Sequence, residues 1–320
     1  MTGFRIGSMS YAVTGAVALA MCIISGIKAP QFLMSGHYGL CFPSPSEWQI
    51  PAFLSWLLNM GLLGVITFAI ISLNRTFNFV RTTRPVLPAI FLIFIAFDPW
   101  ITGRLSSSLI LCGVNLVCLW ILFECYEGRN VTQQMFAIAT FVSVGSMFQY
   151  AFLPMGLVYI LAAILMKEMR FREALAFLLG LIAPWWVVMG LGIVRPDDFL
   201  PPSPFPLFAE GAADDIFLLL VGTGVMIFIG IVCGFANSMR IYAGNSRVSA
   251  MNIVIYWLGI ACLLCILFDS GNIFTYLATL SFCAAVQVAN FCALRQLPHE
   301  WLMLAVPGLF YIIIFSFMVF

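Results

Sequence analysis

Long apolar stretches follow one another along almost the whole chain, and they restrict its fold more than any other feature. An α-helix needs roughly 20 residues to cross about 30 Å of hydrocarbon, at about 1.5 Å per residue. Stretches of this length are separated here by short polar connections. The pattern predicts eleven membrane-spanning helices, at residues 8–27, 50–73, 85–103, 105–124, 133–150, 152–168, 173–194, 215–236, 251–269, 272–294 and 300–320.

The composition excludes a water-soluble fold. Of the 320 residues, 63% are hydrophobic and 8% are charged, whereas a soluble domain carries roughly 25% charged residues. No polar block is long enough to fold separately, so residues 1–320 are expected to form a single all-α integral membrane domain, a bundle of about eleven transmembrane helices. The net charge of +1 offers no basic surface for nucleic acid.

The basic residues predict which ends of the spans face the cytoplasm. With the N-terminus in the cytoplasm, only Lys28, Arg104 and Arg195 of the 14 Lys and Arg residues fall outside. This distribution satisfies the positive-inside rule, and eleven spans then place the C-terminus outside. The assignment requires residues 133–150 and 152–168 to be two separate spans, because merging them would move six basic residues to the outside.

Cysteine and histidine residues are placed unfavourably for disulfides or metal binding. Cys41 is the one cysteine in an outside connection, so no intramolecular disulfide is expected. Cys262 and Cys265 form a C-x-x-C inside a span without a second ligand pair, which favours packing over metal binding. His37 and His299 lie on opposite sides of the predicted membrane. We therefore expect no metal site and no cofactor.

Ionisable residues at the outer ends of the spans are the candidate ligand-binding residues. These are Asp98, Arg104, Arg195, Asp197 and Asp198. An arginine at the low-dielectric membrane boundary pairs strongly with a phosphate, and a nearby carboxylate is a candidate base. The alternative for Asp98 and Arg104 is a structural ion pair. The Pro-rich connection at residues 194–215 is expected to be either a stiff cover over these residues or a plain connector.

Polar residues inside the spans are expected to join helices. Such residues are costly in hydrocarbon and normally form hydrogen bonds to other helices. The set comprises Asn59, Asn115, Gln149, Asn272, Gln287 and Asn290. Apart from Asp98 and Asp269, which both lie near outer ends, no ionisable residue is expected deep in a span, and this disfavours an ion-coupled transporter.

Residues 148–186 resemble an uncharacterised family of bacterial multi-pass inner-membrane proteins of similar length. The similar features are an aromatic-x-x-Pro helix start, a basic cytoplasmic turn, and a span with Gly and Pro. In this sequence they are Tyr150, Phe152 and Pro154, then Arg170, Phe171, Arg172 and Glu173, then Gly180 and Pro184. The resemblance implies a multi-pass helical fold in the bacterial cytoplasmic membrane, and it implies no activity.

Three functions are compatible with these patterns. The first is handling of a lipid-linked envelope precursor at the outer face, either as a glycosyltransferase-like enzyme or as a lipid-binding protein, with a polyprenyl-linked lipid as ligand. The second is a non-catalytic subunit or scaffold of an envelope complex, with a membrane protein as partner. The third is a transporter or flippase. The sequence leaves open whether the protein is an enzyme.

Overall fold

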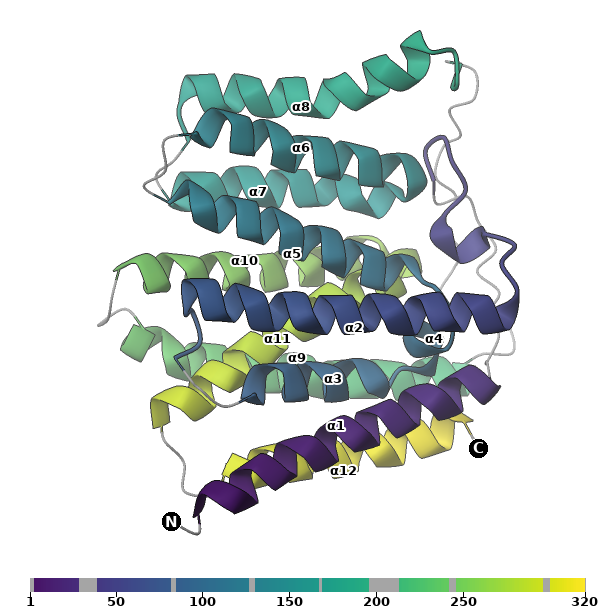
Figure 1. The fold of residues 1–320 in the computed structure, drawn as a ribbon, viewed down its shortest axis with the longest axis vertical. Coiled ribbons are helices and arrows are strands. Elements are labelled where there is room, and N and C mark those ends of the chain that lie inside the picture. The colour runs from purple at the N-terminus through teal and green to yellow at the C-terminus, as the bar shows by residue number, and fades with distance from the viewer. Residues whose placement is uncertain are drawn as a thin grey trace.

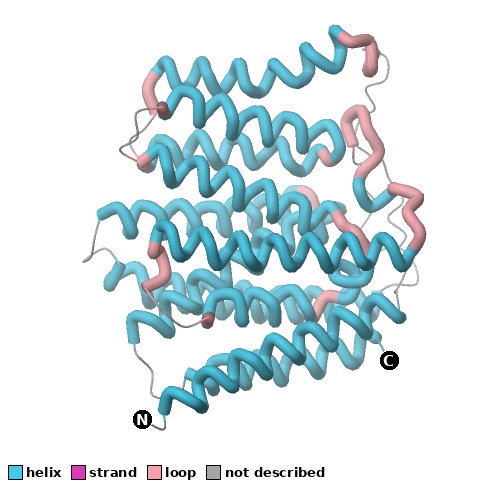
Figure 2. The backbone as a smooth tube through the Cα atoms, in the orientation of Figure 1, coloured by secondary structure: helices cyan, strands magenta, loops and turns pink. Residues whose placement is uncertain are grey.

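The computed structural model describes residues 3–28, 39–81, 85–126, 130–166, 169–195, 213–241, 246–295 and 300–319. All regular structure in these ranges is helical (Figure 2). The helices run side by side in alternating directions, and the two termini lie at opposite ends of the helices (Figure 1). The α-helices are α1 (Gly3–Lys28), α2 (Ala52–Phe77), α3 (Val86–Ala96), α4 (Pro99–Gly103), α5 (Ser107–Cys125), α6 (Val131–Phe148), α7 (Leu153–Leu165), α8 (Phe171–Gly190), α9 (Ala213–Ile241), α10 (Ser246–Phe268), α11 (Ile273–Arg295) and α12 (Glu300–Val319). Short 3-10 helices are η1 (Pro45–Glu47), η2 (Tyr150–Phe152) and η4 (Ser270–Asn272).

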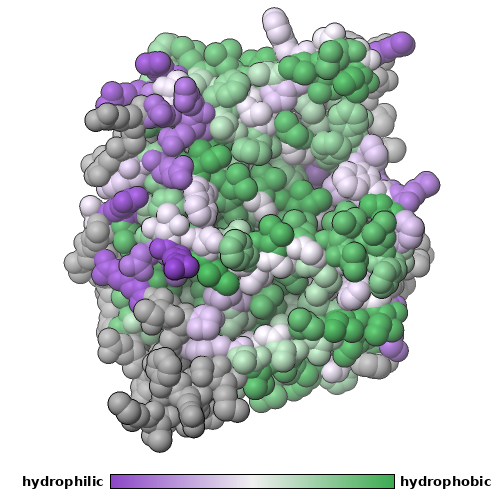
Figure 3. Space-filling view, in the orientation of Figure 1, coloured by the Kyte–Doolittle hydropathy of each residue, from purple (hydrophilic) through white to green (hydrophobic). Residues whose placement is uncertain are grey.

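The length and surface of these helices are those of a multi-pass membrane protein. Eight helices within the described ranges are long and apolar enough to cross a membrane, namely α1, α2, α5, α6, α8, α9, α10 and α11. Shorter apolar helices span Val86–Ala96, Tyr150–Leu165 and Leu304–Val319. In the face shown by Figure 3, hydrophobic residues cover the middle of the helices, and hydrophilic residues gather at the left end of the view and are scattered at the right end. The protein is therefore an all-α membrane protein.

Helix α11 is the centre of the bundle. It packs against α3, α5, α9 and α10, and nearly all of its residues are buried. Small residues such as Ala, Ser and Cys recur along it and let neighbouring backbones approach closely. Helix α8 is the opposite case, because it lies at one edge of the bundle, packs mainly against α6 and exposes most of its apolar side chains (Figure 1).

The third predicted span, residues 85–103, is wrong as a single helix. The chain leaves helical geometry at Asp98, which has φ −96° and ψ 103°, and this separates α3 from α4. The Asp98 carboxylate accepts hydrogen bonds from the backbone N–H groups of Trp100 at 2.9 Å and Ile101 at 3.3 Å, and so caps α4. Pro99 has no N–H to donate to the carbonyl four residues earlier, so the helix cannot continue through it.

The other predicted spans agree with the helices to within five residues at each boundary. Residues 133–150 and 152–168, whose separation decides the predicted sidedness, correspond to two antiparallel helices, α6 and α7. The connection between them is η2 at Tyr150–Phe152. Within η2, the backbone N–H of Phe152 donates to the carbonyl of Gln149 at 3.1 Å, and this bond closes the turn.

The turn of α8 that precedes its proline contacts hydroxyl groups of α6. Pro184 cannot donate to the carbonyl of Gly180, which is left without its helical partner. The Thr140 hydroxyl lies 3.5 Å from this carbonyl, although it donates at 2.9 Å to the Phe136 carbonyl of its own helix. The Ser143 hydroxyl donates to the carbonyl of Leu181, the next residue of α8, at 2.7 Å. The contact therefore fixes α8 against α6 at the position of its proline.

Candidate functional site

The break between α3 and α4 creates a corner at one end of the bundle. We call it the α4 corner and define it as residues 98–106 together with Ser55 and Asn59 of α2. Asn59 Nδ2 donates to the carbonyls of Ile101 at 2.7 Å and Thr102 at 3.2 Å. The Leu105 N–H donates to Ser55 Oγ at 2.9 Å. Because α4 is only about one turn long, its carbonyls need partners outside the helix, and α2 supplies them.

Helix α1 holds the other side of α4. Ser25 Oγ donates to the Pro99 carbonyl at 3.0 Å and lies 2.8 Å from the hydroxyl of Thr102. The Thr102 hydroxyl also donates to the Asp98 carbonyl at 2.8 Å. Helices α1 and α2 thus fix the backbone of the α4 corner from two sides.

Polar atoms without partners are concentrated at this corner. Eight buried side-chain polar atoms in the described ranges have no hydrogen-bond partner, and four of them belong to the α4 corner. They are Asn59 Oδ1, Asp98 Oδ2, Arg104 Nε and Ser106 Oγ. Buried polar atoms are nearly always paired, because an unpaired one keeps its desolvation cost. This corner is therefore the part of the described structure that most lacks a polar partner.

Asp98 and Arg104 do not form the structural ion pair considered above. Asp98 Oδ1 is used by the backbone of α4, and Oδ2 and Arg104 Nε are both without partners. Asp98 is only 1% exposed, so it acts as a helix cap and is shielded from a ligand at the surface. Arg104 is half-buried and keeps its Nε donor for another group.

The remaining candidate residues are not part of the α4 corner. Arg195 follows α8 and is exposed, and α8 lies at the edge of the bundle away from α4 (Figure 1). Asp197 and Asp198 lie outside the described residues, as does most of the Pro-rich connection. The structure therefore brings Asp98 and Arg104 into one corner and leaves Arg195 apart from them.

A second polar group at the same end of the bundle joins three connections. Gln149, between α6 and α7, accepts from Ser44 Oγ at 2.8 Å and donates to Asn272 Oδ1 at 2.7 Å and Thr275 Oγ1 at 3.3 Å. Asn272 in turn donates to Asp269 Oδ2 at 2.7 Å. The segment before α2, the α6–α7 connection and the α10–α11 connection therefore meet through one network, the Gln149 network (Ser44, Gln149, Asp269, Asn272 and Thr275).

Polar residues in the middle of the bundle are also paired. Asn115 of α5 donates to Thr279 Oγ1 of α11 at 3.0 Å and accepts from the Tyr159 hydroxyl of α7 at 2.8 Å. Asn290 of α11 donates to Asn252 Oδ1 of α10 at 2.6 Å.

The prediction that polar span residues join helices is thus confirmed for Asn59, Asn115, Gln149, Asn272 and Asn290. Gln287 is the exception, because its side-chain Nε2 is buried without a partner.

Cysteine and metal chemistry have no visible site. None of the ten cysteines, all of which lie in the described ranges, forms a disulfide, and most of them are buried. Across the described ranges, no group of three or more His, Cys, Asp or Glu residues is arranged to hold a metal ion. Hydroxyl side chains that were not among the candidate residues form several of the hydrogen bonds at this end of the bundle, notably those of Ser25, Ser44, Ser55 and Thr275. Their signal in the sequence is a hydroxyl residue near the end of an apolar span.

Comparison with known protein families, curated proteins and solved structures finds no match for this chain. The resemblance of residues 148–186 to a bacterial membrane-protein family therefore stays a prediction.

Proposed function

We propose that the protein crosses the bacterial cytoplasmic membrane eleven times, with its N-terminus inside, and binds a lipid-linked anionic envelope precursor at the outer face. The Gln149 network supports this sidedness, since it joins three connections that the charge pattern predicts to be outside. At the opposite end, the Arg247 guanidinium lies 5.9 Å from the centroid of the Tyr126 ring, and Asn252 donates to the Phe79 carbonyl at 3.0 Å. These residues belong to connections, or lie close to connections, that the charge pattern predicts to be cytoplasmic.

The observation that carries the binding proposal is the unpartnered Nε of Arg104 in the α4 corner. A guanidinium there lies at the predicted outer end of the third span, at the depth of lipid phosphates. An N–H bond from arginine to phosphate is charge-assisted, and it gains further strength because the boundary has a lower dielectric constant than water. The unpartnered Ser106 hydroxyl offers a second donor to the same group.

The geometry supports binding more than group transfer. Asp98, the one carboxylate in the corner, has one oxygen committed to capping α4 and is almost completely buried. A general base must come within hydrogen-bond reach of the proton it removes. We therefore propose that the site holds and presents a lipid head group.

The sidedness predicts the accessibility of two introduced cysteines. In a Cys41→Ser background, a membrane-impermeant maleimide added to intact cells should label Asp198→Cys and leave Arg247→Cys unlabelled. The two positions are separated by α9, so they fall on opposite sides in either case, but Asp198 is outside and Arg247 inside only if α6 and α7 are separate spans. Labelling of Arg247→Cys in intact cells would overturn the eleven-span topology, and labelling after permeabilisation is the control for reactivity.

Arg104 itself is tested by lipid binding. Undecaprenyl phosphate retention by purified protein, measured by native mass spectrometry, should weaken about tenfold in Arg104→Gln, which corresponds to about 1.4 kcal/mol for one charge-assisted contact. Arg104→Lys should restore part of the binding, because it keeps the charge but loses the planar donors. Arg195→Gln is the matched control, since it removes the same charge at the predicted outer face but away from the α4 corner.

Equal retention in the Arg104→Gln and wild-type proteins would return Arg104 to a structural role. If Arg104→Gln lowers the thermal unfolding midpoint as well as the retention of the lipid, the loss of lipid reflects misfolding, and the proposal is overturned. A protein that co-purifies with wild type and is lost in Arg104→Gln, without any lipid, would favour the scaffold function instead.

A further inference from the structure

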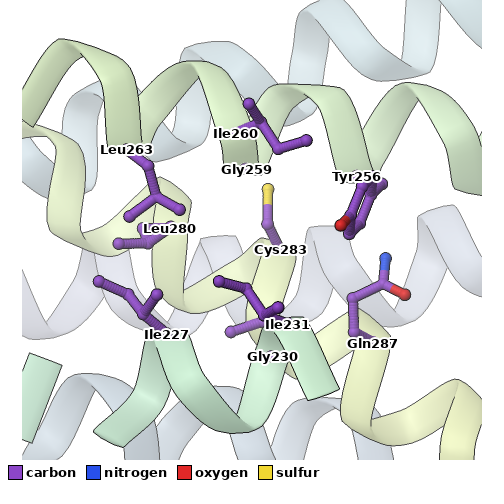
Figure 4. Close-up of a pocket in the computed structure, with 11 residues that line it drawn as sticks. Ile227, Gly230, Ile231, Tyr256, Gly259, Ile260, Leu263, Leu280, Cys283 and Gln287 are labelled. Carbon is purple, nitrogen blue, oxygen red and sulfur yellow. The ribbon is translucent and has the colours of Figure 1, made fainter. Parts of the chain in front are cut away.

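A groove lies between α9 and α10, with α11 as its floor, and it is separate from the α4 corner (Figure 4). Its volume is about 120 Å³. Its walls include Ile231 of α9 and Tyr256 of α10, and its floor includes Cys283 and Gln287 of α11. All eleven lining residues are uncharged, and nearly all are apolar.

The groove opens sideways, toward the surface that faces hydrocarbon. Ile231 is 47% exposed and Tyr256 is 36% exposed, although both line the groove. Their neighbours Val232 and Trp257 are also exposed. A molecule dissolved in the bilayer therefore has direct access to the groove from between α9 and α10.

Gln287 provides the polar group of this groove. The residue is 5% exposed, and its Nε2 has no hydrogen-bond partner. In Figure 4 the amide nitrogen is on the side of Gln287 that faces Tyr256. Gly234 makes this neighbourhood possible, since a Cβ there would meet the Tyr256 ring at 2.9 Å and Gln287 Cγ at 3.6 Å.

The unpaired amide is costly where it lies. A buried donor without a partner keeps its desolvation penalty, and the penalty is higher in hydrocarbon because no water is available to compensate. A leucine or methionine would fill the same space without that penalty. Asn115 and Asn290 of the predicted spans are paired by their side-chain amides within the bundle, whereas Gln287 lines the groove. The amide of Gln287 therefore points to a partner that is not part of the chain.

The depth of Gln287 restricts that partner. It lies eight residues before the end of the 23-residue helix α11, about 12 Å along the axis, and only about 5 Å from the middle of the helix. The ester groups of phospholipids lie at the boundary of the hydrocarbon, about 15 Å from its middle. A phosphate at this depth would be an unpaired charge, and the groove offers no cation to receive it.

We propose that this groove binds a neutral chain lipid whose carbonyl or hydroxyl oxygen accepts a hydrogen bond from Gln287. The chain lies against the isoleucine and leucine residues of α9, α10 and α11, and the oxygen is placed near the middle of the bilayer. Quinones and prenols have this chemistry, because they carry an uncharged oxygen group on an apolar chain and dissolve in the hydrocarbon itself.

The proposal is tested by measuring how two oxygen-bearing probes and one hydrocarbon control bind to the protein in nanodiscs. Decylubiquinone presents carbonyl oxygens and farnesol presents a hydroxyl, whereas dodecane presents neither. We expect saturable binding of at least one oxygen-bearing probe and none of dodecane. Gln287→Leu and Gln287→Met should each weaken that binding about tenfold without lowering the thermal unfolding midpoint, because the amide has no partner in the chain to lose.

Two further variants separate the groove from the general lipid surface. Ile231→Trp should abolish binding by filling the groove, whereas Val232→Trp, at an equally exposed neighbouring position that does not line it, should leave binding unchanged. Equal affinity in the Gln287 variants, or equal binding of dodecane, would overturn the proposal in favour of unspecific partitioning. Loss of binding in Val232→Trp as well would also overturn it.

Discussion

We expect the Gly180→Leu variant to lose the packing of α8 on α6 and to lower the free energy of unfolding by about 3 kcal/mol. A Cβ at Gly180 would lie 2.4 Å from the backbone oxygen of Phe136 and 2.8 Å from the Cβ of Ala139. Neither atom can move without moving α6 itself. Separation of the helices also breaks the bond from the Ser143 hydroxyl to the Leu181 carbonyl, so two penalties arise from one substitution.

The measurement is the unfolding midpoint in a sodium dodecyl sulfate titration. Gly190→Leu is the matched control, because it makes the same change on the same helix where nothing lies within 4 Å of the added Cβ. This control should change the free energy of unfolding by no more than about 0.5 kcal/mol. If both variants unfold at the wild-type midpoint, the close contact of α6 with α8 does not stabilise the protein.

The Gln149→Leu variant is expected to lower the free energy of unfolding by a comparable amount, about 3 kcal/mol. The substitution leaves Ser44 Oγ and Asn272 Oδ1 without the partner that Gln149 provides, and both residues are buried. It also loosens the segment before α2, which then keeps the backbone hydrogen bonds from Cys41 and Phe42 to the Met147 carbonyl but loses the side-chain bond to Gln149. Cys41 lies in that segment, so its alkylation should become faster in the variant.

Gln134→Leu is the control for this second prediction. Gln134 is on α6, the helix that precedes Gln149, and its Oε1 is buried without a partner, so its replacement removes no hydrogen bond from that oxygen. It should leave both the unfolding midpoint and the alkylation rate of Cys41 near their wild-type values. A destabilisation as large as that of Gln149→Leu would show that loss of any buried glutamine amide, rather than of the network, is responsible.

The helical class and most helix positions followed from the sequence, because a bilayer imposes one strong condition. Each spanning segment must be apolar and about 20 residues long, and it must satisfy its own backbone hydrogen bonds. That condition is local, so it can be recognised in a window of sequence. The one break that was missed, at Asp98, depends on a local rule as well: a capping residue followed by proline ends one helix and starts another.

The candidate site was only partly predictable. Asp98 and Arg104 were identified because they are ionisable residues at the end of a span, and the structure does place them in one corner. Their roles were not identified, because whether a carboxylate caps a helix or pairs with an arginine depends on atoms only a few ångströms away. Arg195 was grouped with them from its predicted depth alone, and depth says nothing about which helices are neighbours.

The sequence by itself determined an all-helical membrane protein with polar residues at costly depths, because hydropathy and helix length act along the chain. Only the tertiary structure decided that α11 is central, that α8 lies at the edge, and that Gln149 joins three distant connections. It also decided that the side-chain Nε2 of Gln287, unlike the amides of Asn115 and Asn290, has no hydrogen-bond partner in the described structure. Hydrophobicity places a residue at a depth in the bilayer, whereas pairing depends on which helices are adjacent, and adjacency is set by packing between residues far apart in sequence.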